Sequence, residues 1–338
     1  GMSKDTDNPS GDYMPYDGPE PSDDDPAEFG VQSLVIPLSA TGLRLDQALA
    51  QLLPEHSRSR IQGWIEAGKV ERDGAAVTSV KQRVLGGEEY RVEIEPDPDT
   101  TPDVPEDIPL DIVFEDPVLL IINKPAGLVV HPGNGNRRGT LLNALLHHVP
   151  RAAELPRAGI VHRLDKDTSG LMVVAKTLSA QTDLVRQLQA RTVSREYLAL
   201  VYGDLDHSGT IEAPLARDPN WRTRRAVHPM GKPAITHYSI VERFPEVTLI
   251  RCKLETGRTH QIRVHMQHIG HPLVGDPVYN SGRRGAGRIA FHRQALHALQ
   301  LGLIHPILRE PVQWEVPPPA DFQALLDHLR GVIPWVQP

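Results

Sequence analysis

Two helical patterns and a hairpin follow one another in the first third of the chain. Apolar residues recur with helical spacing over residues 44–53, and a proline then closes the pattern. Ser57 is a suitable N-cap for a second helix, which carries an apolar stripe and ends before a glycine. Asp73-Gly74, between two strand-like stretches, is typical of a tight hairpin. Residues 31–95 are therefore predicted to form a compact unit of two helices and small strands.

From residue 109 onward, short apolar runs and alternating stretches predict strands. Helical patterns interrupt them after Thr140, after Ser179 and around Ile262. The predicted strands, the second of which runs into a turn, are 112–114, 119–127, 159–161, 171–175, 195–203, 236–244 and 247–254. Strands and helices do not alternate regularly, so we expect an α+β fold over residues 109–338 and not a doubly wound sheet.

Two polar segments border these units. Residues 1–30 are rich in Asp, Pro, Gly and Ser, and such a composition cannot bury enough apolar surface to order itself. Residues 96–108 contain four prolines among acidic residues, which is typical of a semi-stiff linker. We therefore predict a disordered acidic tail, a small domain, a linker and a larger domain.

The charge of the chain is concentrated in the predicted tail. The whole chain has a formal net charge of −7, but residues 1–30 hold nine acidic groups and one lysine. The remaining residues are close to neutral, so any affinity for nucleic acid must come from local clusters of basic residues. The single cysteine and the lack of a long apolar segment or a leader-like start favour a cytoplasmic, non-membrane protein.

The stretch HRLDKDTSG, residues 162–170, carries the candidate chemistry. It lies between the predicted strands 159–161 and 171–175, so its polar side chains are expected at the lip of a strand pair. Asp165 follows Arg163 by two residues, and a nearby guanidinium favours the ionised carboxylate. Such a carboxylate could act as a nucleophile or a base, but a surface turn with one ion pair explains the same residues equally well.

Three motifs together resemble one family of enzymes. Residues 162–170 resemble the HRLDxxTSG motif of the pseudouridine synthases that act on ribosomal RNA, and residues 195–203 and 255–265 resemble two further motifs of these enzymes in the same order. The Asn-Lys-Pro-x-Gly stretch at 123–127 also fits. The similarity runs from about Pro109 to the end of the chain and is greatest to the D-type enzymes of the large ribosomal subunit. It implies a mixed, largely antiparallel sheet in the catalytic domain.

The resemblance also implies roles for individual residues. Asp165 would be the essential carboxylate, Tyr197 would stack on the extruded base, and Arg263 would pair with Asp165. Arg163 would fill the gap that the flipped base leaves in the RNA. Without the resemblance, Tyr197 is better explained as a core aromatic residue and Arg263 as part of a surface ion pair. The reaction requires no cofactor or metal, and we predict neither.

Basic residues outside these motifs are candidates for RNA binding. The unit 31–95 resembles the S4 RNA-binding domain, which implies phosphate contacts, although a solvated helix face explains its arginines as well. A basic loop around Trp221 could hold unpaired bases or be a plain surface loop. The candidate RNA-binding residues are Arg44, Arg58, Arg60, Lys69, Arg163, Arg222, Arg224, Arg225, Arg258 and His260.

Other interpretations remain open from the residues alone. Asp165 to Ser169 resembles the aspartyl-phosphate motif of phosphatases in its first three positions. An S4 protein that only binds RNA is a second possibility. Histidines near residue 265 have helical spacing, but no acidic or thiol ligand accompanies them, so we predict no metal site. The expected partner is large-subunit rRNA or a pre-ribosomal particle, with helix 69 as target for a D-type enzyme and another site for a C-type enzyme. We expect a monomer.

Overall fold

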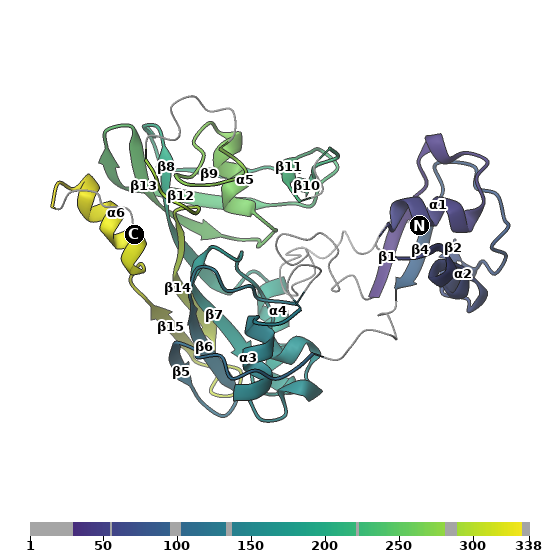
Figure 1. Cartoon of the computed structure of the whole chain (residues 1–338), viewed down its shortest axis with the longest axis horizontal. Helices are drawn as coiled ribbons and strands as arrows, with labels where there is room; N and C mark the ends of the chain where they lie inside the picture. Colours follow the sequence, from purple (N-terminus) through teal and green to yellow (C-terminus); the bar gives the residue numbers. More distant parts are fainter. Residues whose placement is uncertain are drawn as a thin grey trace. The chain divides into compact units, whose positions relative to one another are not determined.

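The chain folds into two compact units in the computed structural model (Figure 1). The structure describes residues 30–54, 56–94, 103–132, 137–220, 223–280 and 289–332. Of these, residues 30–94 belong to the first unit and residues 103–332 to the second. The predicted acidic tail, apart from Gly30, lies outside the described residues, and so do Trp221 and Arg222.

The first unit is a small antiparallel sheet with two helices. Its strands have the order β1-β4-β2-β3, and α1 and α2 pack against each other and against the sheet through one apolar cluster that includes Leu49, Ile65 and Tyr90. The elements are β1 (Gly30–Val35), α1 (Leu45–Leu52), α2 (Arg58–Glu66), β2 (Val70–Arg72), β3 (Ala75–Ala76) and β4 (Glu89–Ile94).

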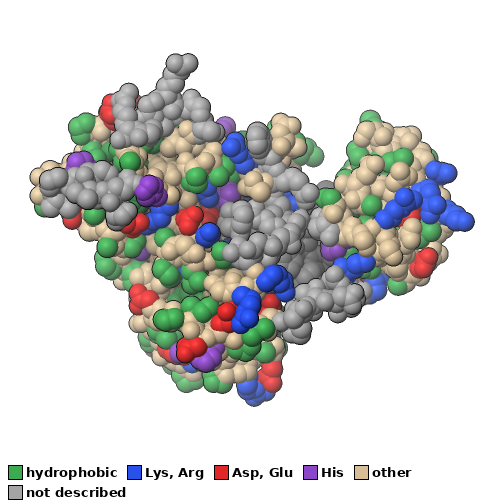
Figure 2. Space-filling model, viewed as in Figure 1, with side chains coloured by type: hydrophobic (Ala, Val, Ile, Leu, Met, Phe, Trp, Pro, Cys, Tyr) green, Lys and Arg blue, Asp and Glu red, His purple; other side chains and the backbone are tan. Residues whose placement is uncertain are grey.

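Local signals in the sequence account for these elements. The Ser57 hydroxyl accepts a hydrogen bond from the Arg60 N–H, so Ser57 caps α2 as predicted. Asp73 and Gly74 both have positive φ, 54° and 80°, and join β2 to β3 in the predicted hairpin. Figure 2 shows Lys and Arg side chains gathered on the visible face of this unit.

The second unit contains a sheet of nine strands. Eight of them have the order β5-β6-β7-β14-β8-β13-β12-β9, and β15 pairs with β14. Among the described strands of this sheet, only β7 and β14 run parallel to each other, so the α+β class and the largely antiparallel sheet are confirmed. The strands are β5 (Ile112–Glu115), β6 (Leu119–Lys124), β7 (Ser169–Ala175), β8 (Ser194–Tyr202), β9 (Gly209–Glu212), β12 (Ile235–Phe244), β13 (Val247–Leu254), β14 (Leu296–Ile304) and β15 (Pro311–Glu315).

Helices cover both faces of this sheet. Apolar residues of α3 and α5 pack into one core with Ile122, Tyr197 and Ala199, whereas α4 and α6 pack against the opposite face. Alternate residues of β6 belong to different cores, which explains why this strand is an unbroken apolar run. The helices are α3 (Leu141–His148), α4 (Leu178–Gln189), α5 (Gln261–His268) and α6 (Ala320–Leu329); β10 (Leu215–Arg217) and β11 (Arg225–Val227) form a separate two-stranded sheet.

Three details differ from the sequence-based prediction. Residues 159–161 form no strand; Ile160 makes a single bridge to Val174, because a 3-10 turn ends at Gly159. Thr177, and not Ser179, caps α4 by accepting from the Ala180 N–H. The described end of the predicted linker belongs to the second unit, where the Glu106 N–H donates to the Asn143 carbonyl at 3.0 Å. The domain boundaries themselves stay a prediction.

Candidate active site

The turn between residues 162 and 168 is held by buried polar groups. His162 lies at its start, and Nε2 of this side chain accepts the Val173 N–H of β7 at 3.0 Å. Burial and, to a smaller extent, the charge of Arg195 together lower the pKa of His162 to about 3. The imidazole is therefore neutral, and its hydrogen bond to β7 orients the turn.

A buried lysine supports the same turn from beneath. Lys124 Nζ donates to the carbonyls of Pro125, Leu128 and Lys166, each at 2.9 Å, and the Gly127 N–H also donates to the Lys166 carbonyl. Burial lowers the Lys124 pKa to about 7, although Asp165 and Asp167 raise it. Lys124 of the Asn-Lys-Pro-x-Gly stretch thus binds three carbonyls and ties this stretch to the turn.

Gly170 allows the turn to join the sheet. Its φ is +123°, and a Cβ at this position would lie 2.3 Å from the Ala298 carbonyl oxygen of β14. No other residue type fits between these two backbones without moving one of them. At the neighbouring position, Ser169 Oγ and His297 Nδ1 lie 2.8 Å apart, which ties β7 to β14 where the two strands pair in parallel.

Asp165 forms an ion pair with Arg263 of α5. Arg263 Nη1 donates to Asp165 Oδ2 at 3.0 Å, and the same guanidinium donates through Nε and Nη2 to both carboxylate oxygens of Asp276 at 2.7 and 3.1 Å. Asp276 also accepts the N–H groups of Val278 and Tyr279. Two carboxylates therefore fix the plane of one guanidinium, and the bidentate bond to Asp276 directs Nη1 toward Asp165.

The environment keeps Asp165 ionised. Burial raises the pKa of its carboxyl, but the charges of His260, Arg263 and Arg163 outweigh this and lower the pKa to about 2. Arg163 is the nearest cation in the sequence, but the hydrogen-bonded partner of Asp165 is Arg263, 98 positions further along the chain, which is the pair that the family resemblance implied. Asp165 is thus an anion across the physiological pH range.

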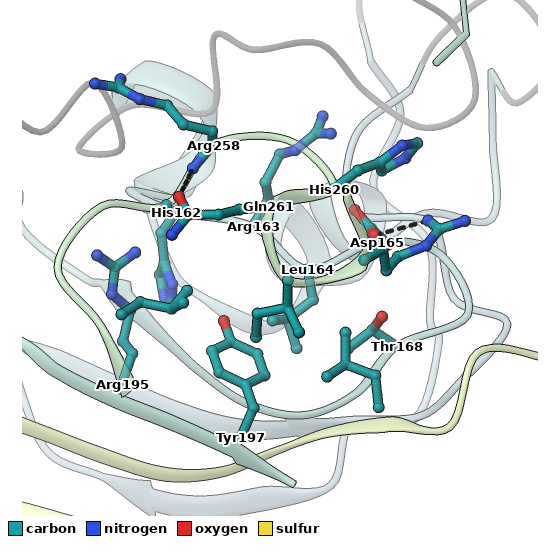
Figure 3. Close-up of a pocket in the computed structure, with 15 residues that line it drawn as sticks. His162, Arg163, Leu164, Asp165, Thr168, Arg195, Tyr197, Arg258, His260 and Gln261 are labelled. Carbon is teal, nitrogen blue, oxygen red and sulfur yellow. Dashed lines mark hydrogen bonds and ion pairs between the residues drawn. The ribbon is translucent and has the colours of Figure 1, made fainter. Parts of the chain in front are cut away.

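Asp165 opens into a pocket of ≈ 600 Å³, which includes solvent at its mouth (Figure 3). The Tyr197 ring rises from β8 into this pocket, and Leu164, Leu254 and Leu296 add apolar surface. An open pocket with an apolar wall and one ionised carboxylate suits a flat polar ring such as a nucleobase.

Basic side chains surround the same pocket. The lining includes Arg163, Arg195, Arg258 and His260. Arg163 Nη2 lies 3.4 Å from the Thr259 hydroxyl, and Arg258 Nε donates to the Pro233 carbonyl at 2.8 Å. Four basic residues beside one carboxylate make the site suitable for an anionic polymer.

The structure thus brings Asp165, Tyr197, Arg263, Arg163, Arg258 and His260 together in one pocket. The roles of these residues remain predictions. Sequence reasoning missed Asp276, Arg195 and Tyr279, whose hydroxyl lies within hydrogen-bonding distance of His260 Nδ1. Asp276 follows Gly275 in an ordinary turn sequence, so no local pattern distinguished it.

The remaining candidate RNA-binding residues lie elsewhere. Arg44, Arg58, Arg60 and Lys69 belong to the first unit, where Asp46 binds Arg44 and Arg58 and the guanidinium of Arg60 lies over the Trp64 ring. Arg224 is half-buried. Arg225 was predicted in an exposed loop but is a buried residue of β11, because its N–H bonds to the Tyr279 hydroxyl and holds the strand against the core.

Metal ligands do not gather in the described part of the chain. Over these residues, no group of three or more His, Cys, Asp or Glu side chains has a metal-binding arrangement. His265 illustrates the reason, since its two ring nitrogens lie 2.8 Å from the Thr236 hydroxyl and 2.9 Å from the Ala213 carbonyl.

Comparison with known proteins identifies the family. Residues 118–268 match the RNA pseudouridylate synthase family, and residues 43–89 match the S4 domain. The ribosomal large subunit pseudouridine synthase D of Nitrosomonas europaea is 57% identical over 303 residues, which cover 88% of each chain. The Escherichia coli K12 protein of the same name is 54% identical and covers 86% of this chain and 91% of its own length.

A solved structure supports the same conclusion. The human protein RNA Pseudouridylate Synthase Domain Containing 1 has a TM-score of 0.51 and 27% identity over 67% of this chain and 87% of its own. The chain therefore belongs to the RNA pseudouridine synthase family, in the group of the ribosomal large subunit pseudouridine synthases D.

Proposed function

We propose that this pseudouridine synthase modifies uridines in large-subunit ribosomal RNA and that Asp165 is its catalytic carboxylate. The observation that carries the proposal is the ionised Asp165, held by Arg263, in a pocket that Tyr197 also lines. The names of the most similar relatives support an rRNA substrate.

The reaction fits a site with one reactive anion. The bond between the ribose and uracil N1 breaks, the base turns, and a bond forms between the ribose and uracil C5, whose proton moves to solvent while N1 gains one. No electrons are gained or lost. Asp165 either attacks the sugar–base unit or removes a proton from it, and both routes need the carboxylate charged at neutral pH.

A uridine in folded RNA must leave its stack to reach Asp165. Unstacking costs a few kcal/mol, which the pocket can offset by contact with Tyr197 and the leucines around it. In this proposal the Tyr197 ring stacks on the extruded base and assists proton removal from C5. Arg163, on the same turn as Asp165, fills the space that the base leaves.

Basic residues of both units hold the RNA backbone in this proposal. Arg258 and His260 at the pocket contact phosphates near the target uridine. In the first unit, Arg44, Arg58, Arg60 and Lys69 supply affinity with little reading of base sequence. The match of residues 43–89 to the S4 domain supports this division of roles.

For the target we propose the uridines of the helix 69 stem-loop. The identity of 54–57% to synthases named D supports a D-type target more than a C-type one. Mapping of pseudouridine in rRNA from cells with and without this protein tests the choice. Loss of modification at another rRNA site, with helix 69 unchanged, would favour the C-type alternative.

The two other interpretations have less support. A phosphatase of the aspartyl-phosphate type needs both carboxylates of the Asp-x-Asp motif in one site. Asp165 lines the pocket, whereas Asp167 is absent from the described lining residues. A protein that only binds RNA would not need the second unit, where the pocket lies.

Substitution of the carboxylate tests the catalytic role. Asp165→Asn is nearly isosteric but cannot act as a nucleophile or base, so we expect pseudouridine formation to fall by at least about 10³-fold. The Kd for RNA should change by less than about threefold, because binding depends mainly on the cations around the site. Retained turnover in Asp165→Asn would contradict the proposal.

We propose that the protein acts as a monomer in the cytoplasm, on free rRNA or on a pre-ribosomal particle. In the described part of the structure, the length and apolar character that a transmembrane helix requires are not met by any helix.

A further inference from the structure

The turn that carries Asp165 is fixed from a second side by a buried arginine. Arg293 Nη1 donates to the Asp167 carbonyl at 3.0 Å, two residues after Asp165. The neighbouring Gln294 side chain donates to the Thr168 hydroxyl at 3.2 Å. The segment before β14 therefore contacts the turn at two successive residues.

Arg293 is in turn held by the C-terminal helix. Its Nε and Nη2 donate to the two carboxylate oxygens of Asp321 at 2.8 and 3.0 Å, and Asp321 lies in the first turn of α6. This bidentate pair leaves Nη1 as the nitrogen that faces the turn. The Arg293 guanidinium also lies over the Phe291 ring, so its plane is fixed by stacking as well.

The helix itself is firmly attached to the sheet. Phe322, Leu325 and Leu326 of α6 are buried in a core with Leu200 and Val274. The position of Asp321 is therefore set by the opposite face of the sheet from the one that carries the pocket. Among the described residues that line the pocket, neither Arg293 nor Asp321 occurs.

The same segment also contacts the backbone beside Asp276, the second carboxylate of the site. Gly275, next to Asp276, has its Cα so close to Arg293 that a Cβ there would lie 2.1 Å from the Arg293 carbonyl oxygen. The Ala295 N–H donates to the Val274 carbonyl. Residues 293–295 thus contact both the turn with Asp165 and the segment with Asp276.

We propose that Arg293 and Asp321 are positioning residues for Asp165, through the Asp167 carbonyl. In this arrangement α6 holds the turn that carries Asp165 in position through Asp321 and Arg293, without contacting the RNA. The inference rests on the proposed function, because it assumes that Asp165 is the reacting group. The inference adds that the Arg293–Asp321 pair, which does not line the pocket, affects the rate of the chemical step.

The test uses the full chain with Asp321→Asn, which keeps the size of the side chain but weakens the bidentate pair. We expect kcat to fall about tenfold, since small displacements of a reacting group are costly, while KM for an rRNA fragment stays within about twofold. The Thr168 and Gly127 N–H groups donate to the Asp165 and Lys166 carbonyls of the turn, so their amide hydrogen exchange should become faster. An unchanged kcat, or a change in KM alone, would overturn the proposal.

The other end of α6 offers a matched control. Arg330 makes a comparable bidentate pair with Glu242, at 2.9 to 3.2 Å, but this pair lies on β12 and does not involve the turn. Glu242→Gln should leave kcat and the exchange at Thr168 unchanged. Equal losses in both variants would mean that α6 acts only through general stability and would overturn the proposal.

A second variant and a parallel measurement complete the test. If Asp321→Asn folds poorly, Arg293→Lys keeps the charge but cannot bind Asp321 and the turn together, and it should reproduce the loss in kcat. Combining the two substitutions should cost no more than the worse one alone. Asp165→Asn is assayed in parallel. Full activity of Asp165→Asn would contradict the proposed function. If Asp165→Asn loses activity but the Arg293 and Asp321 variants keep their kcat, only the present inference is contradicted.

Discussion

Asp46 in the first unit and Asp165 in the second are both carboxylates bound by arginine, and the pKa of each is about 2. The two ion pairs differ in which side chain is buried, the carboxylate or the arginine. The Asp46 side chain is 0% exposed, whereas Arg44 and Arg58, which bind it, are 30% and 46% exposed. Around Asp165 the arginine is enclosed, since Arg263 is 4% exposed and Asp165 is 13% exposed.

The difference determines what each site offers to a ligand. In the first unit a hidden anion orients two arginines, from the start of α1 and the start of α2, toward solvent. In the second unit a hidden cation, held by Asp276, orients one anion toward the pocket. In the proposed function, the same pair of residue types would bind phosphate in the first unit and hold a reactive carboxylate in the second.

Among the variants that separate the two sites, the largest effect is expected for Asp276, the buried partner of Arg263. Asp276→Asn removes the charge that holds Arg263 Nε and Nη2, so the guanidinium can turn away from Asp165. We expect kcat to fall about 30- to 100-fold, with KM for RNA little changed. Steady-state kinetics on an rRNA fragment measure this.

Coupling separates this effect from a loss of stability. Asp276→Asn combined with Arg263→Lys should be no slower than the slower single variant, because both act on one contact. Asp183→Asn is the control, since Asp183 is also a buried carboxylate bound by arginines, on α4. Additive losses in the double variant would show that Asp276 does not work through Arg263.

The corresponding change in the first unit should affect binding and not rate. Asp46→Asn releases Arg44 and Arg58, and we expect the Kd for RNA to rise about tenfold while kcat at saturating RNA stays the same. The lost charged hydrogen bonds should also lower the free energy of unfolding of this unit by about 2 kcal/mol. A fall in kcat at saturation would contradict the separation of roles.

Acid should weaken both units in the same pH window. The pKa values of Asp46 and Asp165 lie below the ordinary value of 3.8, so each ionised carboxylate stabilises the fold above about pH 4. This contribution, about 2 kcal/mol for each group, is lost as the pH falls from about 4 to 2. Urea unfolding between pH 2 and 6 measures it, and Asp46→Asn and Asp165→Asn should each flatten the curve.

The smallest expected effect distinguishes the exposed arginine from the enclosed one. Arg58→Gln should weaken RNA binding about threefold and reduce the slope of log K against log salt by about one. Arg263→Gln should leave that slope unchanged, because the guanidinium faces two carboxylates and not the RNA. Equal slopes for both variants would contradict this distinction.

The sequence alone determined much of this architecture. Helical spacing, the Ser57 and Thr140 caps and the Asp73-Gly74 hairpin predicted elements that the structure contains, because each depends on neighbours within a few residues. The motifs at 162–170, 195–203 and 255–265 likewise contain most of the residues that line the pocket, apart from Leu254 and Leu296.

Only the tertiary structure decided how most of these charges meet. The family resemblance implied the pair of Arg263 with Asp165, which lies 98 positions away, but no pattern in the sequence assigned the contact of Arg293 with the Asp167 carbonyl, 126 positions away. The same is true of Asp276 and Asp321, which sit in ordinary turn and helix-start sequences. Whether a carboxylate or its arginine is enclosed depends on how the helices pack against the sheet, and that is a property of the fold as a whole.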